Sequence, residues 1–273
     1  MSKLGRILPS RANAIAYAAM ALVMAVVPES SFSSFRVNAA WPVWANVVLW
    51  RVVICVSIFA LFNIAYSCYR KHRSKVSIVG DNYSIQVEYG DIFEVAEGKV
   101  VVNFDECFTD RIGDAPSDVK PDSICGQYLL RHPEVDVQDL IGKAGVKPEK
   151  KPRHDGRLRY KPGTIVPNGR YLLMAFAKLD SNGLGCLTYD EYVACLDALW
   201  AQLDMHHGTE DVYVPVLGSR ITRFDKDLTQ QELLDIMVGS YRLSSKKMKK
   251  PNKLHIVCKR RDGFVLNNVF GIC

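Results

Sequence analysis

Two long apolar stretches occupy the N-terminal quarter of the chain, and strand-like and helix-like patterns alternate through the rest. Ala12 to Val27 is apolar apart from Asn13 and Tyr17, and a helix of this length covers roughly 24 Å. Val47 to Tyr66 is long enough to cross a hydrocarbon core of about 30 Å, and aromatic side chains stand near both of its ends. The pattern therefore predicts a hairpin of two transmembrane helices.

Basic residues flank these stretches. Lys3, Arg6 and Arg11 precede the first stretch, and the cluster Arg70 to Lys75 follows the second. The positive-inside rule therefore predicts a multi-pass protein of the cell inner membrane with both chain ends in the cytoplasm, and the lipid bilayer is an expected partner. The alternative is that Lys3 to Val27 is a signal peptide, which is cleaved from the mature protein.

Beyond a boundary at residue 75 the pattern changes to that of an α/β domain. Strands are predicted at residues 83–89, 99–103, 163–167, 171–177, 211–217 and 254–258, and helices at residues 123–131, 135–144, 188–205 and 229–241. Thr229 and Glu232 have capping-box spacing, and Asn168-Gly169 marks a hairpin turn. We therefore expect a mixed central sheet flanked by helices over residues 76–273, preceded by the helical hairpin of residues 1–75. Ligands of such sheets bind beyond the carboxyl ends of the strands.

Composition and charge indicate which cellular compartment and which partners the protein has. Eight cysteines occur without CxxC spacing, a pattern that favours free, buried thiols in a reducing compartment over a disulfide framework. The formal charge of +6 comes partly from the cluster Lys246 to Lys250. That cluster lacks the interleaved aromatic residues of a nucleic-acid site, so we expect a solvated loop and no nucleic-acid partner.

Asp180 to Glu191 nearly matches a calcium-binding loop, with Gly185 at the position that the sharp turn requires. Leu184 replaces one oxygen ligand, and the residues before the loop are patterned as a strand where an EF-hand needs a helix. We therefore expect a strand-to-helix loop in which Thr188 caps the next helix, and no bound metal.

A second candidate site follows the strands. The buried strand before Gly218-Ser219 opens into a turn of small residues, where backbone N–H groups can approach an anion closely. Arg220 and Arg223 add charge that suits a diphosphate. Asp91 follows one predicted strand and Asn103-Phe104-Asp105 the next, so together these residues predict a nucleotide-binding cleft.

Several short motifs, in this order, resemble a divergent macro domain of the kind found in Thoeris antiphage effectors. They are Gly90-Asp91-Ile92-Phe93, Asn103-Phe104-Asp105, Gly126-Gln127-Tyr128-Leu129, Tyr171 to Leu179, Ala198-Leu199-Trp200 and Pro215 to Arg220. The resemblance covers roughly residues 83 to 260. Two membrane helices ahead of such a domain are similar to the type II Thoeris effectors.

The resemblance implies a macro fold that binds an ADP-ribose derivative, needs no cofactor and is not an enzyme. Asp91 matches the aspartate that accepts a hydrogen bond from adenine, and Gly218 to Thr222 matches the phosphate loop. The ligand-binding residues that it implies are Asp91, Ile92, Asn103, Phe104, Asp105, Gly126, Gln127, Pro215, Leu217, Gly218, Ser219, Arg220, Ile221, Thr222 and Arg223.

The first ligand loop departs from the family. Asn103 to Thr109 is bulkier than the Gly-rich loop of ordinary macro domains, which disfavours ADP-ribosyl hydrolysis and leaves room for an altered distal group. The resemblance to type II systems implies that the signal is histidine-ADP-ribose made by a TIR-domain protein. Asp105, Glu106 and Asp110 are the candidates to meet the amine of such a ligand.

We therefore expect a membrane-anchored effector of bacterial antiphage defence. Its signal triggers homo-oligomerisation and membrane disruption, which end in cell death or growth arrest. The alternatives are a membrane-tethered ADP-ribosyl hydrolase and a calcium-responsive membrane protein. Catalytic residues are not expected, because the sequence pairs no serine or cysteine nucleophile with a histidine base, and His206-His207 lie at a predicted helix end.

Overall fold

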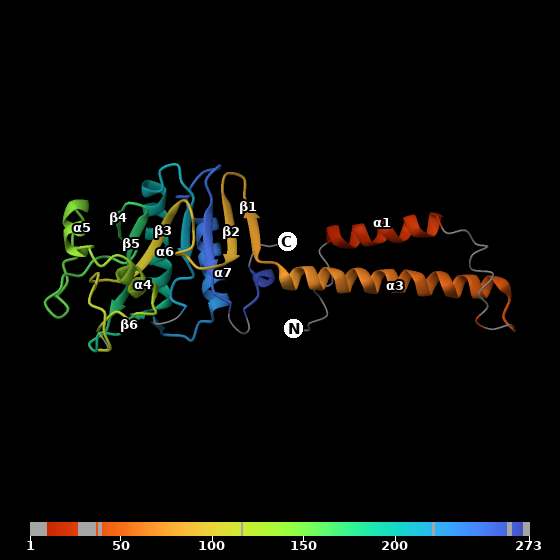
Figure 1. Cartoon of the computed structure of the whole chain (residues 1–273), viewed down its shortest axis with the longest axis horizontal. Helices are drawn as coiled ribbons and strands as arrows, with labels where there is room; N and C mark the ends of the chain where they lie inside the picture. Colours follow the sequence, from red (N-terminus) through yellow and green to blue (C-terminus); the bar gives the residue numbers. More distant parts are fainter. Residues whose placement is uncertain are drawn as a thin grey trace. The chain divides into compact units, whose positions relative to one another are not determined.

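The computed structural model of the chain describes residues 10–26, 37, 40–115, 117–219, 222–260 and 264–269. It divides into two units, residues 1–73 and residues 74–272, which are coloured along the sequence in Figure 1. The first unit contains helices α1 (Ser10–Val26) and α3 (Val43–His72). The second contains the strands and the remaining helices.

Helix α3 has the length and composition of a membrane span. Its stretch Val43–Tyr69 is long and apolar enough to cross a membrane, and it is the one such stretch among the described residues. The 30 residues of α3 cover about 45 Å at the usual helical rise. Apolar side chains project from it, and Trp44 is 70% exposed. A contiguous apolar surface of this kind marks a membrane or protein contact.

Helix α1 carries a shorter apolar stretch, Ala14–Val26. Its 17 residues cover about 25 Å, less than a hydrocarbon core of about 30 Å. A hairpin of two transmembrane helices is therefore not confirmed, because only α3 meets the requirement of length and composition. The first span stays a prediction.

The second unit is built on one mixed sheet. In the described part of the chain the strand order is β1-β2-β9-β7-β3-β5-β6-β8, and β4 pairs with β5 beside this path. Strands β2, β9, β7, β3 and β5 run parallel, whereas β1 and β4 run antiparallel to their neighbours. The bounds are β1 (Lys75–Val79), β2 (Ser84–Tyr89), β3 (Lys99–Asp105), β4 (Ile165–Asn168), β5 (Tyr171–Leu179), β6 (Gly185–Leu187), β7 (Val212–Pro215), β8 (Arg223–Phe224) and β9 (Leu254–Cys258).

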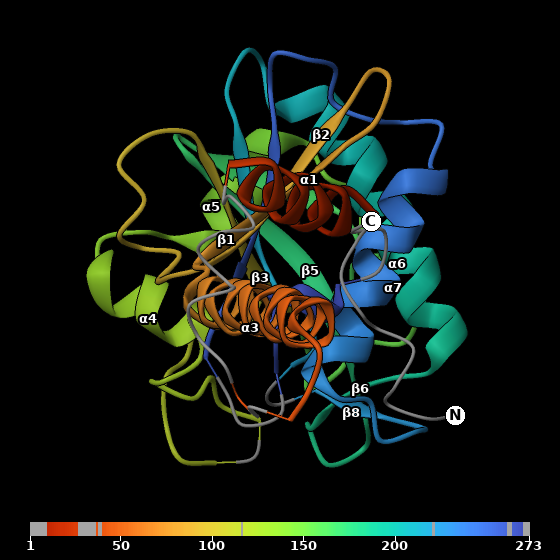
Figure 2. The ribbon, with the colours of Figure 1, turned by 90° about the vertical axis from the view of Figure 1, so that its right-hand side faces the viewer.

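Helices cover both faces of this sheet, as Figure 2 shows, so the predicted mixed sheet with flanking helices is confirmed. The helices are α4 (Ile124–Arg131), α5 (Val137–Ala144), α6 (Tyr189–His206), α7 (Gln230–Leu243) and the short 3-10 helix η2 (Leu266–Asn268). α6 and α7 pack on one face around Trp200 and Leu233. α4 and α5 pack on the other face around Tyr128 and Ile141. Two apolar cores thus lie on opposite sides of one sheet.

Three of the four predicted helix starts are confirmed by their caps. Thr188 and Thr229 each form a capping box with the glutamate three residues later, and the Ser123 side chain accepts a hydrogen bond from the Gly126 N–H. The hairpin turn is shifted by one residue. Asn168 pairs with Tyr171, so the turn consists of Gly169-Arg170, with Gly169 at φ 59°. The left-handed position falls on the glycine, where it is least strained.

The near-calcium loop is a strand-to-helix connection, as predicted. Asp180 Oδ1 accepts hydrogen bonds from the N–H groups of Asn182 (2.8 Å) and Leu184 (2.9 Å). Glu191 caps α6 and pairs with Lys178. Strand β5 precedes the loop where an EF-hand needs a helix. Asp180 and Glu191, two of the expected calcium ligands, therefore already use side-chain oxygens in bonds to the chain.

Candidate functional site

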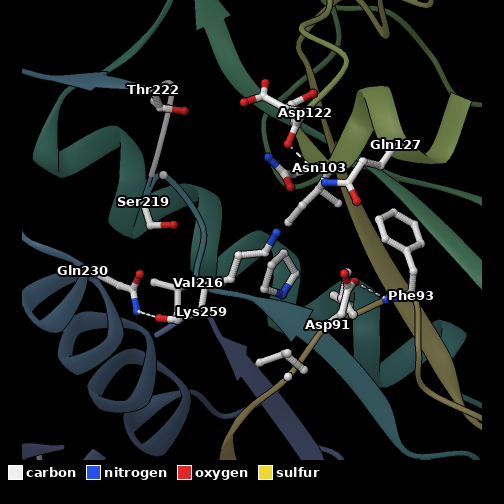
Figure 3. Close-up of a pocket in the computed structure, with 17 residues that line it drawn as sticks. Asp91, Phe93, Asn103, Asp122, Gln127, Val216, Ser219, Thr222, Gln230 and Lys259 are labelled. Carbon is white, nitrogen blue, oxygen red and sulfur yellow. Dashed lines mark hydrogen bonds between the residues drawn. The ribbon is translucent and has the colours of Figure 1, made fainter. Parts of the chain in front are cut away.

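A pocket lies where four parallel strands end, at the carboxyl edge of the sheet (Figure 3). β2 leads into Gly90, β9 into Lys259 and β7 into Val216, while Asn103 lies near the end of β3; all four residues line the pocket. The pocket encloses about 790 Å³, part of which is open to solvent. This position is the one that parallel sheets use for ligands.

Residues from four of the six predicted motifs meet in this pocket. The predicted residues that line it are Asp91, Ile92, Asn103, Gln127, Pro215, Gly218, Ser219 and Thr222. They come from loops after β2 and β7, from β3 and from α4, and those segments are far apart in the sequence.

Asp91 is held by the turn that follows β2. The Gly90 N–H donates to the Cys258 carbonyl (3.2 Å), and the Glu94 N–H donates to the Asp91 carbonyl (3.2 Å). Asp91 Oδ1 accepts a hydrogen bond from the Phe93 N–H at 2.9 Å, shown dashed in Figure 3. Its Oδ2 has no hydrogen-bond partner within the described residues. The side chain is thus oriented by the backbone and keeps one oxygen for an external donor.

The turn after β7 brings backbone close to the pocket. The Val216 N–H donates to the Val257 carbonyl (3.3 Å), and Gly218 has φ 78°. A Cβ on Gly218 would lie 2.6 Å from Phe224 Cζ, so the turn needs glycine for both its conformation and its packing. Successive N–H groups in a turn of this kind can cradle an anion.

Leu217 and Arg223, two other predicted residues of this part of the chain, do not line the pocket. Leu217 is buried in the core, where its carbonyl accepts a hydrogen bond from the Tyr192 hydroxyl (3.2 Å). Arg223 belongs to β8, is exposed and pairs in register with Cys186. Arg220 and Ile221 lie outside the described residues, so their predicted roles stay predictions.

The start of α4 forms another side of the pocket. Asp122, Ser123 and Gln127 line it, and Gln127 Nε2 donates to the Asp122 carbonyl at 3.1 Å. Gly126 was also predicted to bind the ligand, but it does not line the pocket. A Cβ there would lie 2.2 Å from the Lys120 carbonyl oxygen, so this glycine lets α4 pack against the preceding loop.

At the end of β3, Asn103 lines the pocket whereas Phe104 packs in the core. Asn103 lines the pocket, and its Oδ1 is buried with no hydrogen-bond partner in the described part of the chain. A buried amide oxygen of this kind is expected to meet a donor from a ligand or water. Phe104 is buried against the rings of Phe108 and Tyr128, so the structure places it in the core beneath the pocket.

Asp105 also lies outside the pocket lining. The strand register shifts between Phe104 and Asp105, and Asp105 Oδ1 accepts hydrogen bonds from the N–H groups of Cys107 (2.8 Å) and Thr109 (3.2 Å). Burial raises the pKa of the Asp105 carboxyl, although the Thr109 hydroxyl, these N–H groups and the Arg157 charge oppose the rise. The Asp105 carboxylate therefore stabilises the loop that follows it.

The other two acids that were expected to meet an amine are also placed away from the lining. Glu106 is fully buried, and its Oε1 accepts hydrogen bonds from Arg159 Nη2 (2.6 Å) and from the Leu179 N–H (2.8 Å). Asp110 is exposed. The bulky loop after β3 is therefore stabilised from within and by the basic segment that follows α5.

Sequence reasoning missed several lining residues, which are Gly90, Phe93, Asp122, Ser123, Ile124, Val216, Gln230, Val257 and Lys259. Lys259 matters most because it brings a positive charge, and Figure 3 shows its side chain extending toward the middle of the pocket. Gln230 Nε2 donates to the Lys259 carbonyl (3.0 Å) and ties the start of α7 to the end of β9. The rule that ligands bind beyond carboxyl strand ends would have found Lys259, since it directly follows β9.

The described residues contain neither a metal cluster nor a reactive thiol at the pocket. No group of three or more His, Cys, Asp and Glu side chains among them is placed to hold a metal ion. The described cysteines are free, and burial with the nearby Asp105 and Glu106 charges raises the pKa of Cys107 to about 12. A thiol protonated at neutral pH is a poor nucleophile. The arrangement suits binding of an anionic, hydrogen-bonding ligand.

Comparisons with known proteins agree on one family. The model of the macro domain of the Thoeris protein ThsA matches residues 85–259, a range that contains every lining residue of the pocket. The Thoeris protein ThsA of Bacillus amyloliquefaciens (strain Y2) is 29% identical over 194 residues, which are 67% of this chain and 65% of that protein. The chain thus aligns with less than two thirds of the length of this curated relative.

Two solved structures of mutants of the Oceanobacillus iheyensis macrodomain are also similar, the second determined with ADPR. Their TM-scores are 0.45 and 0.44, each at 9% identity. The matches cover 72% and 69% of this chain, and 93% and 91% of the two macrodomain chains. Scores at this level do not by themselves establish a shared fold.

Proposed function

This chain belongs to the family of Thoeris ThsA macro domains, and from that premise we propose that it is a membrane-anchored effector whose pocket binds an ADP-ribose derivative. One observation carries the proposal. The family match contains the whole pocket lining, and that lining combines an open carboxylate oxygen, a glycine turn and a lysine.

The chemistry of the pocket fits the two halves of such a ligand. Asp91 Oδ2 is placed to accept a hydrogen bond from the amino group of adenine. The turn at Gly218-Ser219 and the Lys259 ammonium together offer backbone donors and positive charge to a diphosphate. Asn103 Oδ1, buried without a partner in the described residues, offers an acceptor to a ribose hydroxyl.

The proposed signal is histidine-ADP-ribose, produced by a TIR-domain protein. Asp105 and Glu106 were the first candidates to meet its amine, but Asp105 already bonds to its own loop and Glu106 bonds to Arg159 and Leu179. Asp122 and Asn103 lie together on the pocket lining and are better placed to meet a group beyond the diphosphate (Figure 3). The role proposed here is binding rather than catalysis.

The proposed output is at the membrane. Helix α3 supplies a stretch with the length and composition of a span, and the basic cluster Arg70 to Lys75 follows it, as expected on a cytoplasmic boundary. We propose that ligand binding favours a homo-oligomer, which concentrates these helices and disrupts the bilayer. A ligand drives such a change only by binding the oligomer more tightly than the resting form.

Calorimetry of the full chain in detergent micelles tests the binding step. We expect ADP-ribose to bind the wild-type chain, and Asp91→Ala to weaken binding by about 1–3 kcal/mol, the loss expected for a hydrogen bond to a charged group. Asp81→Ala is the matched control, because Asp81 is an exposed acid before β2, whereas Asp91 follows the opposite end of that strand.

Equal affinities of Asp91→Ala and the wild type would remove Asp91 from the site. Absence of ADP-ribose binding by the wild-type chain would contradict the proposal. The hydrolase alternative predicts that the wild-type chain releases free ADP-ribose from ADP-ribosylated protein. The effector proposal predicts binding without release.

A further inference from the structure

Arg131 lies outside the pocket lining but contacts two residues that line it. It is the last residue of α4 and is exposed. Its guanidinium carbon lies 4.2 Å from the centre of the Phe93 ring. Its Nη1 also lies 3.3 Å from the Gln127 carbonyl oxygen and 3.4 Å from Gln127 Oε1, and it donates to both. Arg131 therefore links the loop after β2 to helix α4.

These contacts continue along one wall of the pocket. The Phe93 N–H donates to Asp91 Oδ1, and Gln127 Nε2 donates to the Asp122 carbonyl. Figure 3 shows Asp91, Phe93, Gln127 and Asp122 along the same side of the pocket. Two segments that are more than twenty residues apart in the sequence thus form one wall. Arg131 joins these segments without lining the pocket itself.

The Phe93 ring is half-buried, borders the cavity and carries a cation over one of its faces. A guanidinium group over an aromatic face is attracted by the ring quadrupole and limits the orientations of the ring. A fixed aromatic ring beside a cavity is a surface on which a nucleobase can stack. Asp91 stands two residues away, so a base stacked there would bring its exocyclic amine toward Asp91 Oδ2.

We propose that Arg131 is a positioning residue of this pocket, which holds Phe93 as the platform for the base of the ligand and Gln127 against the same wall. The inference rests on the proposed function and extends it. It assigns recognition of an amine-bearing base to Phe93 together with Asp91. It also makes that recognition depend on a cation that touches no part of the ligand.

The test compares ligands with and without a base on the full chain in detergent micelles. Calorimetry measures ADP-ribose, and displacement of ADP-ribose measures inorganic pyrophosphate. Loss of one stacked base corresponds to roughly a 5- to 150-fold loss of affinity, which we expect for Phe93→Ala with ADP-ribose but not with pyrophosphate. Phe93→Leu keeps apolar volume without a flat ring, and we expect it to behave like Phe93→Ala.

Arg131 variants separate positioning from general stability. We expect Arg131→Ala to weaken ADP-ribose binding about threefold to fivefold, consistent with one exposed cation–π contact, and to leave pyrophosphate binding unchanged. Arg131→Lys keeps a cation and should recover part of the loss, whereas Arg131→Met keeps the stem and should not. Lys247→Ala is the matched control, because Lys247 lies 5.0 Å from the Tyr83 ring, which is not part of the pocket lining.

The outcomes are distinguishable from a failure of the proposed function. Wild-type affinity for ADP-ribose in Arg131→Ala or Phe93→Ala overturns this inference and leaves the proposed function standing. Equal losses for ADP-ribose and pyrophosphate also overturn it, because they indicate a general distortion of the pocket. A wild-type chain that binds no ADP-ribose overturns the proposed function and this inference together.

Discussion

Polar side chains at the carboxyl ends of the parallel strands differ from those toward the amino ends in whether their hydrogen bonds are made within the chain. At the carboxyl ends of β2, β7 and β9, Asp91 Oδ2 is open within the described residues and the Lys259 side chain extends into a pocket. Toward the amino ends of β7 and β9, His255 bonds to Asp211 and also to Glu88, which reaches it from β2. The difference separates groups that stabilise the sheet from groups that are left for a ligand.

The side chains that bond to one another surround His255, which is buried. Its Nδ1 lies 2.8 Å from Glu88 Oε1 and its Nε2 lies 3.1 Å from Asp211 Oδ2. A ring nitrogen that carries a hydrogen donates to the carboxylate that it faces. The ring also stacks on Tyr213 at 4.2 Å between centroids. Three neighbouring strands are thereby joined through side chains as well as through their backbone ladders.

The comparison teaches that acidity alone does not mark a binding residue. Asp211 and Asp91 are both acids beside the ends of parallel strands. Asp211 Oδ1 accepts the Lys253 N–H at 2.8 Å and its Oδ2 faces His255, so both oxygens are occupied. Asp91 uses one oxygen in its own turn and keeps the other. Hydrogen-bond occupancy, rather than residue type, distinguishes the two.

Replacing His255 should have the largest effect. We expect His255→Gln to lower the free energy of unfolding by roughly 1–3 kcal/mol, because the substitution leaves the Glu88 and Asp211 carboxylates without the ring nitrogens that face them. Urea titration of the full chain in detergent measures the change. His206→Gln, at the end of α6, is the control and should stay near the wild type. A loss below about 1 kcal/mol would show that the two carboxylates are well solvated without the histidine.

Gly218→Ala should have the next largest effect, and that effect should be on ligand affinity. Gly208 and Gly218 both have positive φ, so an alanine at either position carries a similar backbone strain of about 1 kcal/mol. Nothing lies within 4 Å of a Cβ at Gly208, whereas Phe224 blocks one at Gly218. We expect ADP-ribose affinity to fall about tenfold in Gly218→Ala, which is about 1.4 kcal/mol, and to be unchanged in Gly208→Ala. Equal affinities would place the turn outside the site.

Lys259→Ala should weaken binding less, because an exposed lysine is a flexible point charge. We expect a loss of about fivefold for ADP-ribose, and no loss for adenosine, which lacks the diphosphate. Lys253→Ala is the matched control, since Lys253 precedes β9 and Lys259 follows it. Calorimetry at low and high salt should show a weaker salt dependence for Lys259→Ala than for the wild type. A similar loss in Lys253→Ala would mean that only the overall charge matters.

Asp105→Asn should have the smallest effect and a characteristic pH dependence. Burial raises the pKa of this carboxyl in the folded chain, so the ionised form opposes folding at neutral pH. That penalty is relieved as the pH falls through the folded pKa toward the unfolded value. Asparagine keeps the acceptor for the Cys107 and Thr109 N–H groups. We therefore expect Asp105→Asn to raise the free energy of unfolding at pH 7 by less than about 1 kcal/mol.

The pH profile of this variant distinguishes burial from a ligand role. The difference between Asp105→Asn and the wild type should shrink when urea titrations are repeated at progressively lower pH. Asp110→Asn, which changes an exposed acid of the same loop, is the control variant. If Asp105→Asn instead weakens ADP-ribose binding as strongly as Asp91→Ala, the carboxylate acts in the site despite its closed position.

Local signals made most of the α/β domain predictable. Alternating and β-branched runs located β2, β3, β5, β7 and β9, because each of these strands carries its own apolar pattern. Caps located two helix starts, at Thr188 and Thr229, because a capping bond joins residues only three positions apart. The edge strands β1 and β8, and β6 next to β8, were missed. β6 and β8 are too short for a pattern, and β1 follows a basic cluster that was interpreted as a membrane boundary.

Within the site, the sequence by itself determined Asp91 and the Gly218 turn, because each depends on the order of a few adjacent residues. Only the tertiary structure brought Phe93, Gln127 and Lys259 to one pocket, since their meeting depends on which strands and helices become neighbours. It also decided that Asp105 turns inward, through a register shift between two strands that the sequence of one strand does not encode. Backbone turns are local, whereas the occupancy of a side-chain oxygen is set by atoms from distant parts of the chain.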